Sequence, residues 1–96
     1  MKKPKTRFER DKDQIIENLE EIRTTVMRCK YDGFADTEEQ AQDEIATLIS
    51  KTKAAAVHTE IMDVIIRARS LETDLDSFLS RRGLETLSLS WPRLVD

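Results

Sequence analysis

The chain has 96 residues, of which 39% are hydrophobic and 36% are charged, and its net charge is −3. This length predicts one small domain, and the acidic balance disfavours a protein whose whole surface binds nucleic acid. No window approaches roughly eighteen apolar residues, and no apolar run follows the basic amino terminus, so neither a membrane span nor a signal peptide is expected. The single cysteine cannot form an intrachain disulfide. This fits a reducing compartment, and we expect a cytoplasmic protein.

The first predicted helix spans about residues 7–31. Thr6 and Glu9 have the spacing of a capping box, which satisfies free N–H groups at the start of a helix. Behind it, apolar residues recur twice per heptad, interrupted only by Lys12, and such a narrow seam is typical of a helix that pairs with another helix. The seam consists of Phe8, Ile15, Leu19, Ile22, Val26 and Cys29. Cys29 is therefore expected to be a small packing residue and not a nucleophile.

The predicted turn after this helix contains Tyr31, Asp32, Gly33 and Phe34, and glycine suits the left-handed end of a helix. These four residues resemble the Trp-x-Gly turn of the small helical hairpins that type VII systems secrete, which are about this length. Tyr31 stands where that family has tryptophan. The tyrosine-containing export signal expected after the second helix is missing, because Tyr31 is the only tyrosine. A small secreted helical hairpin is therefore kept as a further alternative.

A second and a third helix are predicted over about residues 37–56 and 58–82. Asp36 and Thr37 begin two overlapping capping-box pairs, and the acidic residues that follow suit the positive end of a helix dipole. A single helix over both ranges would be about 70 Å long, which is excessive for this chain. The apolar seam also slips by two residues, so we expect a break near residues 56–59. The seam before the slip is Ala41, Ile45, Leu48, Thr52 and Ala55, and the seam after it is Val57, Ile61, Val64, Ala68, Leu71, Leu75 and Phe78.

The third helix carries more apolar surface than one neighbouring helix can cover. On a helical wheel its apolar arc exceeds half of the circumference, so the helix needs neighbours on two sides. His58 and Arg69 flank one apolar face, and we expect them at the ends of an interface, where they reach for solvent or a neighbouring acid. No glutamate precedes His58 by three residues, so a metal site of the bundle type is not expected. The predicted interface residues are Ile61, Met62, Ile65, Ile66 and Arg69.

Residues 84–96 are predicted to form an extended, apolar tail after a helical domain over residues 1–83. Gly83 and the two arginines before it mark the end of a helix. Leucines and Trp91 then alternate with serines, which indicates extended chain, and Pro92 excludes a central strand. Such a tail must be covered, either by its own bundle, by a sister subunit or by another protein. The predicted partner-binding residues are Leu87, Leu89, Trp91, Leu94 and Val95.

These patterns predict an all-α protein, either a small three-helix bundle or a long helical hairpin, completed by self-association because the chain is too short to cover all of its seams. We expect a non-enzymatic protein–protein interaction module, a small adaptor, chaperone or inhibitor without cofactor or metal, whose partner is another protein or a second copy. The only candidate general base is His58. The alternative is a nucleic-acid-associated accessory protein with a basic amino terminus. Its phosphate contacts would come from Lys2, Lys3, Lys5, Arg7 and Arg10.

Overall fold

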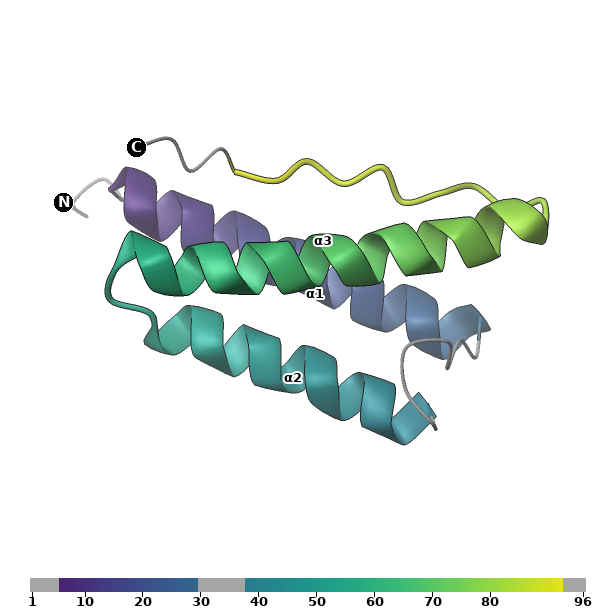
Figure 1. Ribbon diagram of the computed structural model, residues 1–96, viewed down its shortest axis with the longest axis horizontal. Coiled ribbons are helices and arrows are strands. Elements are labelled where there is room, and N and C mark those ends of the chain that lie inside the picture. Colours follow the sequence, from purple (N-terminus) through teal and green to yellow (C-terminus); the bar gives the residue numbers. More distant parts are fainter. Residues whose placement is uncertain (1–5, 30–37, 93–96) are drawn as a thin grey trace, which may run out of the picture.

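The computed structural model describes residues 6–29 and 38–92 of the chain. These residues form an all-α bundle in which α1 spans Arg7–Cys29, α2 spans Glu38–Ala54 and α3 spans His58–Arg81. α1 and α3 run in the same direction, α2 runs antiparallel to both, and the segment after α3 returns along the bundle (Figure 1). The prediction of a small three-helix bundle is therefore confirmed, and the long hairpin is excluded.

The predicted seams of the three helices meet in one core. On α1 the seam is buried in its middle, and its end residues Phe8 and Cys29 are partly buried against the core. The seam of α2 and the following turn is buried throughout. On α3 the seam is buried except at its ends, where Val57 is 52% exposed and Phe78 is partly buried. α3 contacts both α1 and α2, so the two neighbours that its wide apolar arc requires both come from the same chain.

The break between α2 and α3 lies where the apolar seam slips by two residues. Val57 precedes α3 with an extended backbone (φ −135°, ψ 157°). Lys12 of α1 reaches this break, and its Nζ donates hydrogen bonds to the carbonyl oxygens of Lys53 (3.0 Å) and Ala55 (2.8 Å). A cation at the negative end of a helix dipole stabilises the end of that helix. Lys12 interrupts the apolar seam of α1 because its amine binds the end of α2.

Two helix ends carry the capping residues that the sequence predicts. At the start of α1, the N–H of Glu9 donates to the hydroxyl of Thr6 (3.1 Å). At the end of α3, Gly83 takes a left-handed backbone (φ 72°), and the N–H of Leu84 donates to the carbonyl of Leu79 (2.8 Å). This is the bond of a Schellman motif, which satisfies a free carbonyl and reverses the chain. The reversal directs the residues after Gly83 back along the bundle.

Several predicted features lie outside the described residues. Between α1 and α2 these are the turn residues Tyr31, Asp32, Gly33 and Phe34, and the capping residues Asp36 and Thr37. At the two ends of the chain they are the basic residues Lys2, Lys3 and Lys5 and the tail residues Leu94 and Val95.

Candidate functional site

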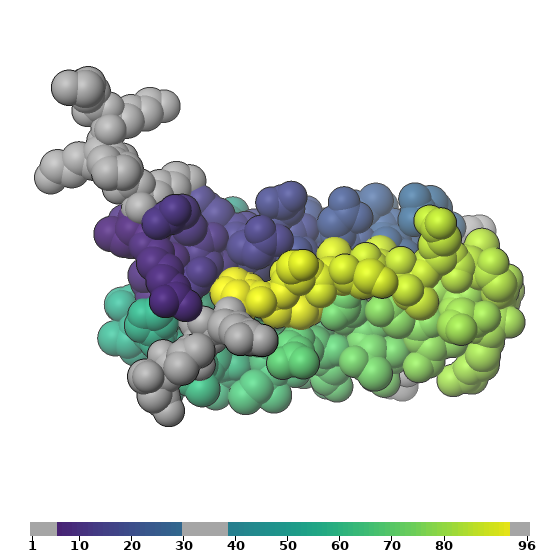
Figure 2. Space-filling view, turned by 90° about the horizontal axis from the view of Figure 1, so that it is seen from above, coloured from purple at the N-terminus to yellow at the C-terminus, as the bar shows by residue number. Residues whose placement is uncertain are grey.

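The segment that follows α3, residues 84–92, is referred to as the strap. Figure 2 shows the strap lying over the line where α1 meets α3. Its side chains Leu87, Leu89 and Trp91 are partly buried against the core, whereas the intervening serines are exposed. The alternation predicted for the tail is therefore present, and the strap covers a groove of its own bundle.

One wall of this groove is α3, which binds the strap through two carboxylates one helical turn apart. The N–H of Leu87 donates to Oδ1 of Asp76 (2.9 Å), and the N–H of Leu89 donates to Oε2 of Glu72 (2.7 Å). The indole Nε1–H of Trp91 donates to Oε1 of Glu72 (2.8 Å). Four residues of helix rise about 6 Å, and two residues of extended chain span nearly the same distance. The carboxylates therefore match the spacing of alternate N–H groups.

The other wall is α1, which binds the strap through Asn18. The side chain of Asn18 is buried, with 3% of its residue surface exposed. Its Nδ2 donates to the carbonyl of Ser90 (2.6 Å), and its Oδ1 accepts a bond from Nε2 of Gln14 (2.9 Å). Hydrogen bonds to the strap thus come from acceptors on α3 and from a donor on α1. Most of them are made with the main chain, so α1 and α3 hold the strap by its backbone as well as by its side chains.

Ser88, in the middle of the strap, has a left-handed backbone conformation (φ 49°). This conformation costs a residue other than glycine roughly 1–2 kcal/mol, so it persists only where neighbouring contacts hold it. The residues on both sides of Ser88, Leu87 and Leu89, are the two whose N–H groups bind the carboxylates of α3. The bonds to Glu72 and Asp76 therefore hold the strap in a defined shape. Together with the bond from Asn18, these contacts are referred to as the clamp.

The predicted interface on α3 is divided between the core and the surface. Ile61 and Ile65 are 0% and 7% exposed and belong to the core, so a partner cannot reach them while the bundle is folded. Met62 and Ile66, one turn apart, are 37% and 66% exposed, and Arg69 is exposed as well. These last three residues remain accessible on the folded bundle.

Among the residues that the structure describes, His58, Arg7 and Arg10 are further polar side chains that the sequence singles out, and all three are exposed. His58 is exposed, and its ring meets the ring of Phe8 edge to face at 5.1 Å. Arg7 and Arg10 are exposed on the first turns of α1, and Nε of Arg7 lies 4.0 Å from a carboxylate oxygen of Asp11. The two contacts lie within the first turns of α1 and at the start of α3.

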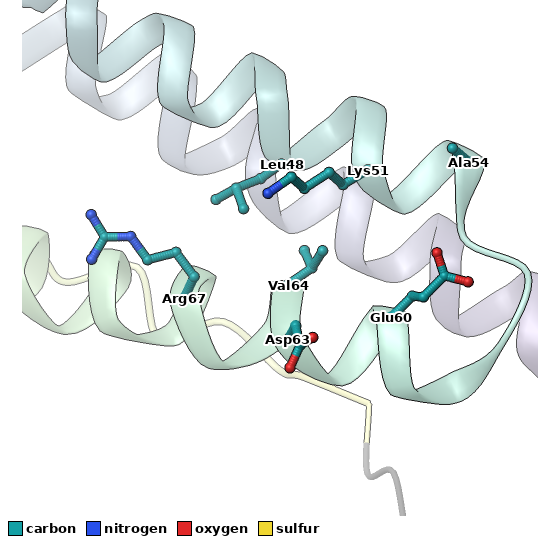
Figure 3. A pocket seen from close by; sticks show the side chains of 7 residues that line it. All are labelled: Leu48, Lys51, Ala54, Glu60, Asp63, Val64 and Arg67. Carbon is teal, nitrogen blue, oxygen red and sulfur yellow. The ribbon is translucent and has the colours of Figure 1, made fainter.

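A second concave surface, of about 410 Å³, lies between α2 and α3 (Figure 3). Its lining includes both basic and acidic side chains, and two of them form hydrogen bonds within the bundle. Arg67 donates to the carboxylate of Glu44 on α2, and this bond raises the pKa of Arg67. Glu60 accepts a hydrogen bond from the N–H of Ala56 at the start of α3 (3.2 Å). The groove is lined by Leu48, Lys51, Ala54, Glu60, Asp63, Val64 and Arg67.

Neither a cluster of metal-ligating side chains nor a membrane-spanning helix is found in the part of the chain that the structure describes. Within residues 6–29 and 38–92, no three side chains of His, Cys, Asp or Glu come together to hold a metal ion. None of the helices in that part of the chain has both the length and the apolar character needed to cross a bilayer. No family model, curated protein or solved structure matches the chain. The groove under the strap binds the main chain of residues 87–90 through side chains of α1 and α3.

The residues that clamp the strap, Asn18, Glu72 and Asp76, are not singled out by sequence reasoning. A signal for two of them exists, because Glu72 and Asp76 each follow a seam residue, Leu71 and Leu75, and thus border the buried face of α3. Acidic residues are common on exposed helix surfaces, and this signal becomes specific only when a strand-like segment is known to lie beside them.

Proposed function

We propose that the protein is a non-enzymatic protein–protein interaction module, a small adaptor, chaperone or inhibitor, whose groove between α1 and α3 binds an extended apolar segment. The observation that carries this proposal is the clamp on the strap. Main-chain groups of Leu87, Leu89 and Ser90 are bound by side chains of the two walls. Main-chain hydrogen bonds of this kind give affinity for extended peptides, and pockets for alternate side chains give specificity.

The groove selects a segment by the spacing of its main-chain N–H groups and by one indole ring. Two N–H groups two residues apart meet Asp76 and Glu72, and an indole N–H two residues further on meets the second oxygen of Glu72. Apolar side chains at the same three positions pack against the core. The preferred ligand is therefore an extended segment with two apolar residues and a tryptophan at alternate positions. In the strap these residues are Leu87, Leu89 and Trp91.

The strap can leave the groove at a lower cost than unfolding the bundle. Its apolar side chains are only partly buried, and its first residues 84–86 are exposed. Segments with few buried contacts open locally with a smaller free energy than the whole domain. An undocked strap leaves apolar surface of the groove in water, which favours rebinding of the strap or of a similar segment. The strap therefore acts as an intramolecular ligand of the groove, and a partner has to displace it.

A cytoplasmic location is part of the proposal. The single cysteine, Cys29, is a free thiol that is partly buried against the core. Free thiols persist in compartments that are kept reducing, and disulfides are rare there. The module is therefore expected to meet its partner in the cytoplasm.

A fluorescently labelled peptide with the sequence of residues 84–92 tests the proposed function. Because the tethered strap competes at an effective concentration on the order of millimolar, the peptide is added to the full chain carrying Trp91→Ala, whose own strap is weakened. We expect a saturable rise in anisotropy below about 1 mM peptide. A second substitution in the same chain, Glu72→Gln, should weaken this binding by about tenfold, because it removes one of two charged acceptors.

The matched control is Asp74→Asn in the Trp91→Ala chain. Asp74 is an exposed carboxylate of α3, and its substitution removes the same charge as Glu72→Gln without touching the strap. Peptide binding should be unchanged. Absence of saturable binding to the Trp91→Ala chain, or equal losses in the two doubly substituted chains, would show that the groove is not a recognition site.

A further inference from the structure

Gly83 and the first three residues of the strap form a short hinge between α3 and the part of the strap that is bound in the groove. The hinge consists of residues 83–86, and Leu84, Glu85 and Thr86 are all exposed. Its sharp reversal depends on Gly83, whose φ of 72° costs glycine less than any residue with a side chain. Every hydrogen bond between the strap and the groove described above begins at Leu87 or later. The closed arrangement, in which the strap lies on its own bundle, therefore depends on the backbone angle of Gly83, while the hydrogen bonds to the groove lie beyond the hinge.

We propose that two copies of this chain exchange straps, so that the partner segment bound in the groove is the strap of a second copy. This inference rests on the proposed function and names the partner. A second copy supplies the one segment whose fit to the groove is shown residue by residue. After exchange, the bonds to Glu72, Asp76 and Asn18 are all kept, and only the hinge changes conformation. Exchange of an identical element is a low-cost route to a dimer because the contacts of the monomer are reused.

The hinge is long enough and apolar enough for such an exchange. Four extended residues span about 13 Å, which carries the strap away from its own α3 and across to the groove of a neighbour. Leu84 in the hinge is 50% exposed in the closed form. In a two-fold symmetric pair the two hinges lie side by side, so the two copies of Leu84 can cover each other. The small size of the chain also favours dimerisation, because association buries surface that a domain of this length cannot bury alone.

A substitution in the hinge shifts the balance between the closed and the exchanged form. A β-carbon at Gly83 meets no atom within 4 Å, so Gly83→Val opposes the closed hinge through its backbone angle alone. This strain lowers the population of one closed hinge by roughly tenfold. Two hinges open in a dimer, so we expect the dimerisation constant to rise by roughly a hundredfold in sedimentation equilibrium. Thr86→Val is the control, because it places the same side chain in the hinge at a residue without a positive φ and removes only an exposed hydrogen bond to the hydroxyl of Ser88 (3.2 Å).

Mixing two full-length variants distinguishes strap exchange from any other dimer. One variant carries Glu72→Gln, which has an intact strap and a weakened groove. The other carries Trp91→Ala, which has an intact groove and contains no tryptophan, because Trp91 is the only one in the chain. Adding excess Trp91→Ala chain should shift the emission of the Glu72→Gln chain to the blue and protect it from acrylamide. Circular dichroism of each variant verifies that its helices are formed.

The results separate this inference from the proposed function. A blue shift in the mixture, together with stronger dimerisation of Gly83→Val than of Thr86→Val, supports exchange. An unchanged emission spectrum at several hundred micromolar Trp91→Ala chain overturns it. If the free strap peptide nevertheless binds the same Trp91→Ala chain, the groove is a recognition site whose partner is another protein. If the peptide also fails to bind, the proposed function itself is refuted.

Discussion

Replacing Glu72 by glutamine tests how the strap is held in the folded monomer. The carboxylate of Glu72 accepts two hydrogen bonds, one from the N–H of Leu89 (2.7 Å) and one from the indole of Trp91 (2.8 Å). Glutamine has the same shape but only one acceptor oxygen, and its amide group presents N–H donors in place of the other. One of the two strap donors therefore loses its acceptor and faces another donor.

The expected loss is about 1–2 kcal/mol of strap docking free energy. A hydrogen bond to a charged group contributes roughly 1.5–3 kcal/mol, and the lower part of this range applies because water reaches the partly exposed strap. Each 1.4 kcal/mol is a tenfold change in the docking equilibrium. If the strap undocks while the three helices stay folded, as proposed, the loss of global stability cannot exceed the docking free energy itself. The effect should therefore be larger on the environment of Trp91 than on the melting temperature.

Fluorescence of Trp91 measures this effect directly. In the wild-type chain we expect a blue-shifted spectrum that acrylamide quenches slowly, because the ring is partly buried against the core. Glu72→Gln should shift the emission to the red, increase quenching and speed amide exchange at Leu89, with little change in helicity. Asp74→Asn is the charge-matched control on the same helix and should leave all three signals unchanged. A wild-type spectrum in Glu72→Gln, or an equal change in Asp74→Asn, would refute the assignment of the clamp.

Two further predictions concern the bundle. Lys12→Met keeps the length of the side chain but removes two hydrogen bonds to the end of α2, and it should lower the free energy of unfolding in urea by about 1–2 kcal/mol. An unchanged urea midpoint would contradict this role. Ile65→Ala should cost about 2–5 kcal/mol, whereas Ile66→Ala in the next position should change stability by less than about 0.5 kcal/mol. Similar losses at the two positions, measured by thermal melts, would contradict the exposed fractions of 7% for Ile65 and 66% for Ile66.

Helical periodicity by itself identified most of the core. The seams of α1 and α2 are buried nearly as predicted, and the two-residue slip in the apolar pattern coincides with the break between α2 and α3. These predictions succeed because a helix turns by a constant angle per residue, so the spacing of apolar residues decides which of them share a face. The same reasoning identified Lys12 as an exception in its seam without explaining it. Its partners lie 41 and 43 residues away, at the end of another helix.

Periodicity could not separate buried from exposed residues where the apolar face of a helix is wider than the surface that its neighbouring helices cover. Ile65 and Ile66 have the same side chain in adjacent positions, and both were predicted to form an interface. The structure buries the first and exposes the second. The difference depends on where α1, α2 and the strap lie around α3, and this arrangement is not encoded in the local pattern of α3.

The sequence also determined that the tail must be covered, because alternating leucines and a tryptophan are too apolar to remain in water. Only the tertiary structure decided what covers it. The groove is built from Asn18 on one helix and from Glu72 and Asp76 on another, and the bond from Asn18 to Ser90 joins residues 72 positions apart. Each of these polar side chains is ordinary within its own helix. They become a binding site only when two helices are placed side by side at the distance that an extended chain can bridge.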